Sequence, residues 1–540
     1  MPPSSIPLEY TAFVALACSL LWIATKPSRP LPPGPRGLPF VGNLFDFPTF
    51  KPWEVFASWG EKYGPIMSAK AMGHTFIIIN DEDIANSIVV EGGMNYADRP
   101  TSVLFEIANM QSFVTGPYEG RIRAMRQMIA RLMGTPTNIR KYYPIMDYHA
   151  IKMVKDLSHH KDGETTAMVA LRKASAAVAL HLTYGYVVKD DPGVQDPLIA
   201  LAEKMLDTIS KFSAQGKRLV EIFPLLRYWP SWMPGSGFKR DIKKSYESIR
   251  IACQAPFEWV VVQMQVGTAQ ESFVRDLLSE EGITNEGRAL ILSMASSIYG
   301  AAVETTAAAI SAYIIASCLY PEVQERFHAE LDRVVGTDRL PTLDDRARLP
   351  YAEAVCKEAL RWVPTIPLAF PHLASQEGVY NQYRIPKGSL VITNIWAMQH
   401  DPAKHPDPMV FRPERYLGPN PEHESWKNAF GFGKRMCPGK NFIDPVLFIT
   451  ITKIAAVFNI TKAIGPDGKA VEPRVGSSRT GNFPYGMRFC ARLRLTVVHS
   501  GQDPFPCNIQ PRSEAVLRMV SDAHSFPPFQ LDPSAPSLVV

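Results

Sequence analysis

The sequence lacks the cysteine spacing of a disulfide framework or a zinc site. Its seven cysteines are scattered over 540 residues, which favours a reducing compartment for the bulk of the chain. It also lacks long charged runs and internal repeats, and its net charge of +5 is mild, so composition points to no nucleic-acid partner. No Gly/Ser linker divides the chain, whose 46% of hydrophobic residues can bury a large core.

The N-terminus lacks the basic residues that precede the apolar stretch of a cleaved signal peptide. Residues 10–25 carry no charge; as a helix they reach about 24 Å, slightly short of an endoplasmic-reticulum bilayer of about 27 Å. Lys26 and Arg29 follow the stretch and no cation precedes it, so the positive-inside rule places the body in the cytoplasm. We expect residues 1–26 to be an uncleaved single-pass anchor and residues 27–45 to be a stiff, proline-rich hinge.

Residues 46–523 predict a mainly α-helical domain with a small β-rich lobe. A hairpin is expected, with strands 66–71 and 74–79, and mixed stretches between 365 and 391 indicate further strands. The longest helical segment, 290–320, is nearly apolar, so a second membrane span competes with a buried core helix. An ionisable residue at its centre is costly in lipid and favours the core helix.

A glycine-rich decapeptide, residues 430–439 (FGFGKRMCPG), is the most informative segment of the chain. It places Cys437 in a turn before the apolar run 442–458. A helix starting there directs its N-terminal amides at the sulfur and favours thiolate over thiol. Gly433 and Gly439 allow close backbone approach. The combination describes a fifth ligand for haem iron.

This decapeptide resembles the haem-binding signature of the cytochromes P-450, the haem-thiolate monooxygenases, at every fixed position. A phosphate-binding loop fits less well, because five residues rather than four separate its two relevant glycines. The resemblance runs from about residue 31 to about residue 484 and implies the cytochrome P-450 fold, with haem b as cofactor and Cys437 as the ligand of its iron. It also implies that Phe430 shields the sulfur from water and that Gly439 and Arg435 adjoin the haem.

Haem propionates need cations, and the resemblance suggests Arg435, Arg126 and His372 for this role. Arg126 ends a segment similar to the family's Trp-Arg-x-x-Arg helix, in which Ile122 replaces the tryptophan, so one expected donor is missing. His372 follows a proline where fungal members often carry a propionate-binding histidine. A lone histidine in the core or on the surface remains the alternative.

Residues 301–306 (AAVETT) resemble the oxygen-activation motif of the family's long central helix. In that interpretation Glu304 and Thr305 relay protons through water to the oxygen being reduced. Ala302 stands where the family usually has glycine, which predicts a tighter groove over the haem. A capping or core role for the threonine pair is the alternative.

Glu358 and Arg361 lie three residues apart and share a helix face if that segment is helical. The resemblance pairs them with Arg415, in a role that locks the core beneath the haem. A buried pair of this kind needs further hydrogen bonds to offset its desolvation. The remaining histidine clusters, His159-His160 and His400 with His405, lack a zinc ligand set and are expected in solvated loops.

The resemblance implies a monooxygenase that inserts one oxygen atom of O2 into a lipophilic small molecule. It implies electrons from NADPH-cytochrome P-450 reductase, for which Lys427, Lys434 and Lys440 offer a basic patch, and a location on the endoplasmic-reticulum membrane. The sequence resembles those of fungal family members that act in secondary metabolism, on terpenoids or polyketides. The stretches that align with the family's substrate pocket are largely apolar, including Val103, Leu104, Phe105, Val363 and Leu368.

Two other function classes stay open. One is a haem-thiolate isomerase or dehydratase that uses no external electrons, against which Glu304 and Thr305 argue. The other is an inert haem-binding protein, an interpretation that the departures from the family pattern at Ile122 and Ala302 favour. The C-terminal part also departs from fungal relatives, because residues 486–502 resemble an insertion. Residues 524–540, rich in proline and serine, predict a disordered tail.

Overall fold

The computed structural model describes residues 29–48, 50–71, 73–101, 103, 113–114, 116–158, 166–189, 195–214, 220, 224–475 and 505–523. Helices dominate these residues and three small sheets accompany them, which confirms the prediction of a mainly α fold. The expected membrane anchor, the segment 486–502 and the C-terminal tail lie outside the described residues.

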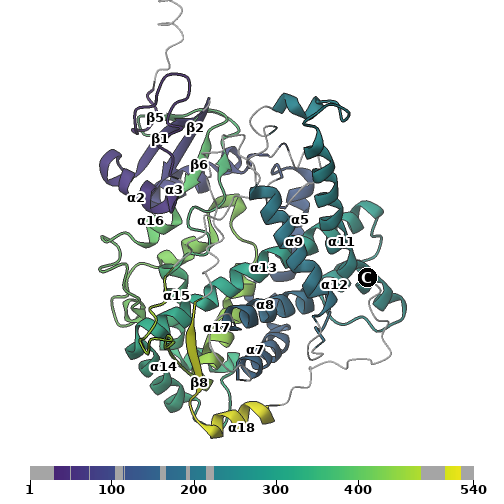
Figure 1. Cartoon of the computed structure of the whole chain (residues 1–540), viewed down its shortest axis with the longest axis vertical. Coiled ribbons are helices and arrows are strands. Elements are labelled where there is room, and N and C mark those ends of the chain that lie inside the picture. The colour runs from purple at the N-terminus through teal and green to yellow at the C-terminus, as the bar shows by residue number, and fades with distance from the viewer. Residues whose placement is uncertain are drawn as a thin grey trace, which may run out of the picture.

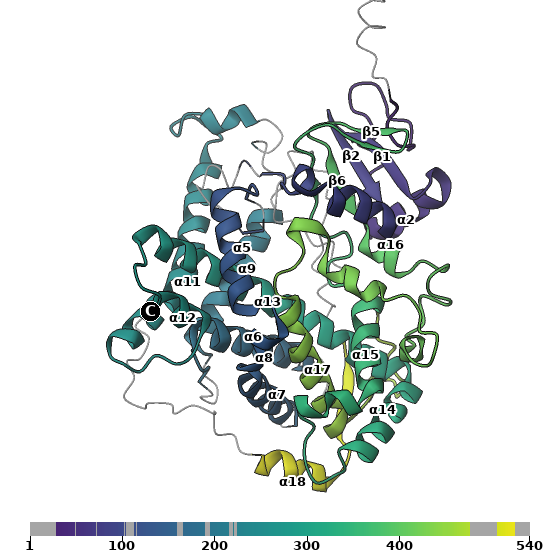
Figure 2. The same cartoon turned by 180° about the vertical axis from the view of Figure 1, so that it is seen from behind.

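The helical lobe forms the body of the molecule, and the largest sheet lies at one end of it (Figures 1 and 2). The longer helices are α2 Pro52–Tyr63, α5 Gly120–Met133, α7 Tyr143–Ser158, α8 Thr166–Tyr184, α9 Pro197–Ala214, α11 Gly237–Gln265, α13 Asn285–Leu319, α14 Pro321–Val334, α15 Pro350–Trp362 and α17 Lys440–Val457. The shorter α-helices are α3 Glu82–Ala85, α6 Pro136–Arg140, α12 Phe273–Leu278, α16 Ile395–Gln399 and α18 Glu514–Asp522. One short π-helix, η1 Asn86–Glu91, is described. The short 3-10 helices are η2 Gly93–Tyr96, η3 Pro224–Tyr228, η4 Leu343–Arg348, η5 Pro413–Tyr416, η6 Ser425–Phe430 and η7 Gly433–Arg435.

The largest sheet contains the predicted hairpin, β1 Ile66–Ala71 and β2 His74–Ile79, which pair antiparallel. β6 Leu390–Thr393 pairs parallel with β2, and β3 His372–Leu373 pairs antiparallel with β6. The apolar end of β2 is buried between α2 on one face and α3 with η1 on the other, so its residues form a continuous hydrophobic run rather than an alternating one. A second, two-stranded sheet joins β4 Gly378–Tyr380 to β5 Tyr383–Ile385.

The edge of the largest sheet holds a segment that lies far away in the sequence. An isolated bridge joins Asp98 to Leu373, whose N–H donates to the Asp98 carbonyl oxygen at 2.9 Å. The bridge fixes Arg99, the next residue, beside the start of β3. Residues almost 280 positions apart thus meet where the sheet contacts the helical lobe.

α13 runs through the centre of the helical lobe. The Thr284 hydroxyl caps its N-terminus by accepting from the Gly287 N–H at 3.1 Å. Within the described part of the chain it is the one helix long and apolar enough to cross a membrane, but most of that apolar stretch is buried inside the protein. Its packing partners include α8, α15 and α17, so the core-helix interpretation is confirmed and the second membrane span is wrong.

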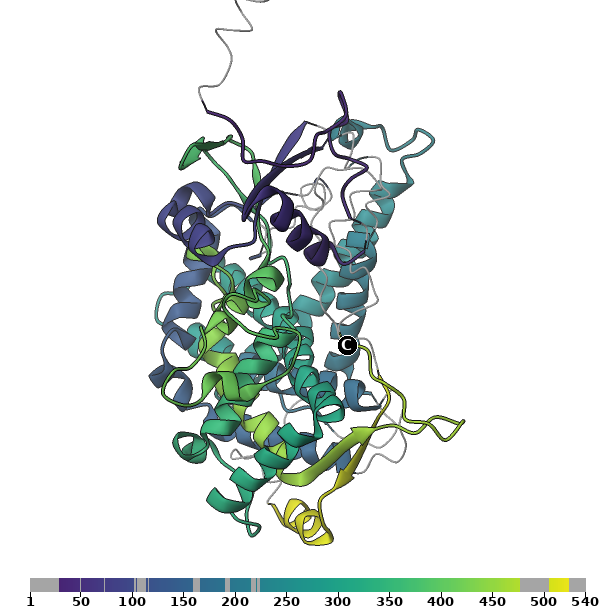
Figure 3. The ribbon, with the colours of Figure 1, turned by 90° about the vertical axis from the view of Figure 1, so that its left-hand side faces the viewer.

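α17 begins directly after the Cys437 loop, at Lys440, and leads into β7 Phe458–Lys462. β7 pairs antiparallel with β8 Cys507–Pro511. Figure 3 shows that this small sheet and α18 lie at the end of the molecule opposite the β1–β2 hairpin. The helix therefore connects the cysteine loop to a well-packed apolar cluster that includes Phe448, Ile451 and Ile454.

Candidate functional site

The Cys437 loop is shaped by backbone hydrogen bonds and by one glycine. The Cys437 N–H donates to the Phe430 carbonyl oxygen at 2.8 Å, and the Met436 N–H donates to Gly433 at 3.1 Å. Gly433 has a φ of +61°, and a Cβ there would lie 2.7 Å from the Val89 carbonyl oxygen, so only glycine fits this position. The described residues make no such demand at Gly439, where an added Cβ would meet only the Cys437 sulfur, at 3.8 Å.

Opposing effects act on the Cys437 thiol. Burial raises its pKa, while the Gly439 N–H and the charge of Arg126 act to lower it. The residue nevertheless keeps accessible surface, so its side chain is not closed off by packing. The amide acts on the sulfur as expected from the sequence, but the protein alone favours thiol, since burial outweighs the amide and the cation. A bound metal ion deprotonates a coordinating thiol.

Three arginines converge beside this loop: Arg99 and Arg435 are buried, and Arg126 is partly buried. Arg435 donates to the carbonyl oxygens of Ala97 at 2.6 Å, of Phe113 at 3.3 Å and of Gly116. Arg126 donates to the carbonyl oxygen of Met436, one residue before the cysteine. Arg126 also forms a hydrogen bond with the Tyr118 side chain. The hydrogen-bond partners of both guanidinium groups are therefore groups without a net charge.

Arg99 is the third arginine, and the sequence analysis missed it. It donates to the carbonyl oxygens of Phe370 and, at 2.9 Å, Pro371, whereas its buried Nε has no hydrogen-bond partner among the described residues. Burial and the charges of Arg435 and Arg126 hold its pKa well below its usual range. Burial and Arg126 likewise lower the pKa of Arg435 to about 10.

His372 lies in the same group and is 2% exposed. Its Nδ1 lies 2.6 Å from the Tyr96 carbonyl oxygen, and since a carbonyl only accepts, Nδ1 carries the proton. Burial and the charge of Arg99 hold its pKa well below its usual range. The histidine is thus neutral, and its second nitrogen has no proton in this state.

This arrangement fits a group that brings two carboxylates. Among the described residues no salt bridge pairs Arg99, Arg126 or Arg435 with a carboxylate, and one buried N–H is unsatisfied. Because buried charges are normally paired, the group is completed by anions from outside the chain. The donor set of a haem, which is one sulfur with nearby cations for the propionates, matches these residues.

A second buried group of charges surrounds Glu358 on α15. Both carboxylate oxygens accept from Arg361, each at 2.7 Å, and one also accepts from Arg415 Nε at 3.0 Å and from the Arg412 N–H at 2.9 Å. The side chains of Glu358, Arg361 and Arg415 are fully buried. The structure therefore brings together the three residues that the resemblance paired.

The histidines expected in solvated loops belong partly to this network. His405 is fully buried and lies 2.9 Å from the Glu422 carboxylate and 2.6 Å from the Ser425 hydroxyl, while Glu422 also accepts from Arg415. His400 is 6% exposed and stacks on Trp396. The expectation was wrong for both residues, because it considered only metal ligation. His159 and His160 lie outside the described residues.

Glu304 and Thr305 occupy the middle of α13, and neither is fully buried. The Glu304 carboxylate pairs with Arg172 of α8 at 3.2 Å. The Thr305 hydroxyl donates to the Ala301 carbonyl oxygen at 2.7 Å and retains lone pairs that can accept from water. Arg172, which the sequence analysis also missed, therefore sets the position of the acid in this motif.

The remaining predicted residues are placed as follows. Ile122 is 2% exposed in an apolar cluster of α5, and this packing leaves no polar donor there. Val363 and Leu368 are buried in apolar clusters, as is Val103, whereas Leu104 and Phe105 lie outside the described residues. Phe430 packs edge-on against Trp426.

The fold and the site define a haem-thiolate protein, and comparison with known sequences specifies the family. The sequence profile of the family "Cytochrome P-450" matches residues 32–473, so the chain belongs to the cytochrome P-450 family.

The chain is similar to several fungal members of this family. It is 36% identical to cytochrome P-450 monooxygenase claR of Ampulloclitocybe clavipes, over 97% of this chain and 94% of the relative. It is 36% identical to monooxygenase ppsD of Aspergillus oryzae, over 84% and 87%. It is 32% identical to multifunctional monooxygenase af510 of Aspergillus fumigatus, over 87% and 89%. The protein is a monooxygenase that binds haem b with a cysteine thiolate as the axial ligand and uses O2, a small-molecule substrate and a redox partner.

Proposed function

We propose that this enzyme inserts one atom of O2 into a lipophilic fungal secondary metabolite, of the terpenoid or polyketide class. The observation that carries the proposal is the Cys437 loop, where a sulfur beside the Gly439 N–H lies near two buried arginines, Arg99 and Arg435, and the partly buried Arg126. The fungal relatives, all monooxygenases by name, support the reaction type. The buried apolar side chains of Val363 and Leu368, in stretches aligned with the family's pocket, support a lipophilic substrate.

The haem, when bound, supplies the iron at which O2 is reduced and from which one oxygen atom passes to the substrate. Cys437 ligates that iron. Thr305 would hold a water by accepting its hydrogen bond while donating to Ala301. Glu304 would take up a proton from solvent and pass it to that water. Glu304 and Arg172 are 22% and 35% exposed, so their ion pair is screened and opens at a cost of about 0–1 kcal/mol. The carboxylate can therefore exchange between Arg172 and the water.

The propionates are bound by Arg99, Arg126, Arg435 and His372 in this proposal. The arginines donate through N–H groups not used by backbone carbonyls, and charge-assisted bonds of this kind are the strong ones. His372 would have to take up a second proton to donate from Nε2, since Nδ1–H is engaged by Tyr96.

The electron donor is NADPH-cytochrome P-450 reductase in this proposal, docking beside the cysteine loop. Lys440 lies about 6 Å from the rings of Trp426 and Phe430, and Lys434 is exposed. Lys427 is paired with Glu424, so it contributes less to the patch than the sequence suggested. Lys434 and Lys440 form no salt bridge with any described residue, and their charges favour an acidic partner.

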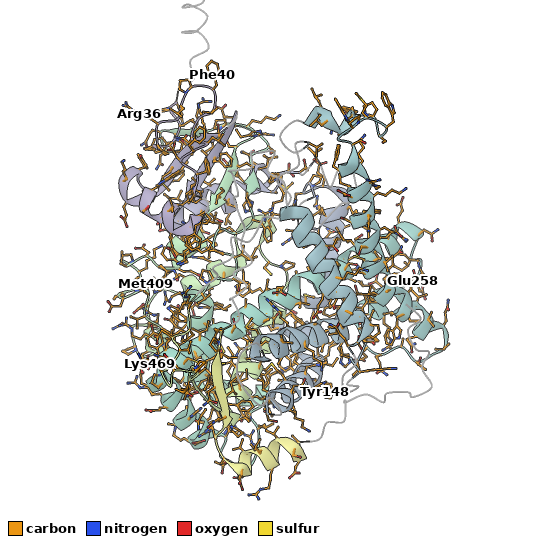
Figure 4. All side chains as sticks on the ribbon, viewed as in Figure 1. Arg36, Phe40, Tyr148, Glu258, Met409 and Lys469 are labelled. Carbon is orange, nitrogen blue, oxygen red and sulfur yellow. The ribbon has the colours of Figure 1, made fainter. Side chains whose placement is uncertain are left out.

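The enzyme is held at the endoplasmic-reticulum membrane by residues 1–26, with its catalytic domain in the cytoplasm, in this proposal. Phe40 is fully exposed, and Leu225 and Trp232 are more than 75% exposed. Phe40 and Arg36 project at the end of the molecule where the described chain begins (Figure 4). Exposed aromatic residues of this kind favour the boundary between membrane and water.

The test is the carbon-monoxide difference spectrum of the reduced protein, expressed in a microsomal host. A strongly red-shifted Soret band is expected for the native chain and its absence for Cys437→Ser. Reductase and NADPH are then added, and consumption of NADPH with O2 separates a monooxygenase from an isomerase. An unshifted band in the native protein contradicts ligation by Cys437.

A further inference from the structure

A cationic groove lies between α9 and α11, outside the site described above. Its volume is about 450 Å³. Its walls combine positive and apolar side chains, namely Leu201 and Lys204 from α9 and Arg240, Lys243, Lys244 and Ile251 from α11. Such walls suit a ligand with an anionic head and an apolar body.

The positive charges of the groove are not neutralised within the described chain. Lys243 and Lys244 follow Arg240 by three and four residues on α11, so all three side chains lie on the same face of the helix. Among the described residues neither they nor Lys204 form a salt bridge. Glu247 also lines the groove. Its carboxylate pairs with Arg250 and also interacts with the charge of Lys243, so one carboxylate faces four cations. The groove therefore keeps an excess of positive charge, which an anion offsets.

The position of the groove indicates where that anion comes from. Arg240 is eight residues after Trp232, which is 82% exposed, and Leu225 in η3 is 80% exposed. The N-terminal end of α11 and the first described residues lie at the same end of the molecule (Figures 1 and 3). The groove thus opens along a helix that starts at the proposed membrane boundary.

We propose that this groove binds the anionic headgroup of a membrane phospholipid. Lys204, Arg240, Lys243 and Lys244 contact the phosphate, and the acyl chains leave the groove past the N-terminal end of α11, toward the proposed membrane boundary. Basic side chains near a membrane surface each favour anionic lipid by about 1 kcal/mol. The proposal rests on the proposed membrane association, and the experiment separates the two.

The test uses the full-length protein in neutral detergent and short-chain lipids below their critical micelle concentration. Dihexanoyl phosphatidic acid is titrated, with dihexanoyl phosphatidylcholine and inorganic phosphate as parallel probes. Binding is measured by hydrogen-exchange protection of residues 237–251. We expect protection by the anionic lipid, with an apparent Kd at least about tenfold lower than for either other probe.

A charge-matched pair of variants localises the effect. The groove variant R240Q/K243Q/K244Q is expected to raise the Kd for phosphatidic acid at least about tenfold. The control R333Q/K387Q/K469Q removes three exposed cations elsewhere and is expected to leave it unchanged. Both variants should keep the red-shifted carbon-monoxide band, which shows that the haem site is intact.

Several outcomes overturn the proposal. If inorganic phosphate binds as tightly as phosphatidic acid, the groove is a general anion site. If phosphatidylcholine binds as tightly, the groove does not select for a negative headgroup. If both variants lose the same affinity, the effect comes from the net charge of the protein rather than from the groove. A groove variant that loses affinity only for the reductase means a protein contact. Co-sedimentation with phosphatidylcholine vesicles tests membrane association separately. A protein that sediments but shows no protection of 237–251 by phosphatidic acid overturns the groove alone.

Discussion

Two buried groups of arginines in this protein differ in how their charge is balanced. Around Glu358, the guanidinium groups of Arg361 and Arg415 meet carboxylates at 2.7 and 3.0 Å. Beside Cys437, the hydrogen bonds of Arg99, Arg126 and Arg435 reach backbone carbonyls and the Tyr118 side chain, and among the described residues none reaches a carboxylate. Burial by itself lowers the pKa of Arg415, but Glu358 and Glu422 outweigh it and raise that pKa. The pKa of Arg435 is instead lowered to about 10.

The difference distinguishes a structural group from a ligand-binding group. A network whose charges are paired inside the chain needs no ligand to balance them, so its role is structural. A group of cations that has no anionic partner in the chain favours the binding of an anionic ligand. The same residue type therefore has two roles, which the surroundings decide. The predictions below test this contrast, from the largest expected effect to the smallest.

Glu358→Ala is expected to have the largest effect. It leaves Arg361 and Arg415 as uncompensated buried charges and should lower the free energy of unfolding by about 3–5 kcal/mol. Haem retention should be lost with it, since the core under the Cys437 loop loosens. Urea denaturation and the carbon-monoxide spectrum check both effects, with Glu358→Gln as the isosteric control. A folded Glu358→Ala protein that retains its haem would contradict the structural role of Glu358.

Arg99→Met is expected to act in opposite directions in the two forms of the protein. In haem-free protein it removes a buried cation with an unsatisfied N–H and should raise the free energy of unfolding by about 1–3 kcal/mol. In the haem-bound protein it removes a propionate partner, so haem transfer to apomyoglobin should accelerate about tenfold, for about 1.4 kcal/mol. Arg361→Met should destabilise both forms. Equal effects of Arg99→Met on both forms would contradict the contrast.

Histidines in the two groups are expected to give different pH profiles in haem-free protein. Burial lowers the pKa of both His372 and His405, but Glu422 opposes the shift at His405. The unfolded chain binds a proton as the pH falls through about 6.5 while the folded chain does not. Stability is therefore lost on acidification, by up to about 1.4 kcal/mol per pH unit for each histidine.

Replacing these histidines separates the two contributions. His372→Gln should flatten the profile over a wider range, extending further below pH 6.5, than His405→Gln does. Chemical denaturation at half-unit intervals from pH 7.5 to 4.5 provides the measurement. A His405→Gln profile flattened over the wider range would show that the carboxylate does not distinguish the two groups.

Thr305→Ala is expected to have the smallest effect on stability, below about 0.5 kcal/mol, since among the described residues its hydroxyl bonds to Ala301 of the same helix and to no other. The amount of product per NADPH should fall and released hydrogen peroxide should rise, because water is no longer held for proton delivery. Thr305→Ser keeps a hydroxyl and should preserve coupling. An unchanged product yield in Thr305→Ala refutes the proton-relay role.

Local patterns in the sequence were sufficient for much of the fold. The strands 66–71 and 74–79 were predicted with the observed bounds, because two short runs flanking a Met-Gly turn are a signal that acts over a few residues. The long central helix was predicted from 290 to 320 and spans Asn285–Leu319. Its capping threonine, Thr284, lies outside the apolar pattern, which explains the late predicted start.

Long-range contacts account for what the sequence analysis missed. Arg99 carries no local signal, since its partners, Phe370 and Pro371, are about 270 residues away and meet it only through the Asp98–Leu373 bridge. His405 was placed in a solvated loop, although Glu422 and Ser425 bury it. Sequence spacing reports neighbours on one element, whereas these groups are assembled from several.

The sequence by itself determined the hairpin, the core helices, and a cysteine in a turn that only Gly433 can form, because these depend on short-range backbone geometry and periodicity. The tertiary structure decided the charge state of that site. Burial raises the pKa of Cys437 against the pull of the Gly439 N–H. Packing of the sheet edge against the helices gathers Arg99, Arg126 and Arg435 beside it, and among the described residues no carboxylate forms a salt bridge with them. Desolvation and charge pairing depend on every atom within several ångströms, and the fold alone determines which atoms those are.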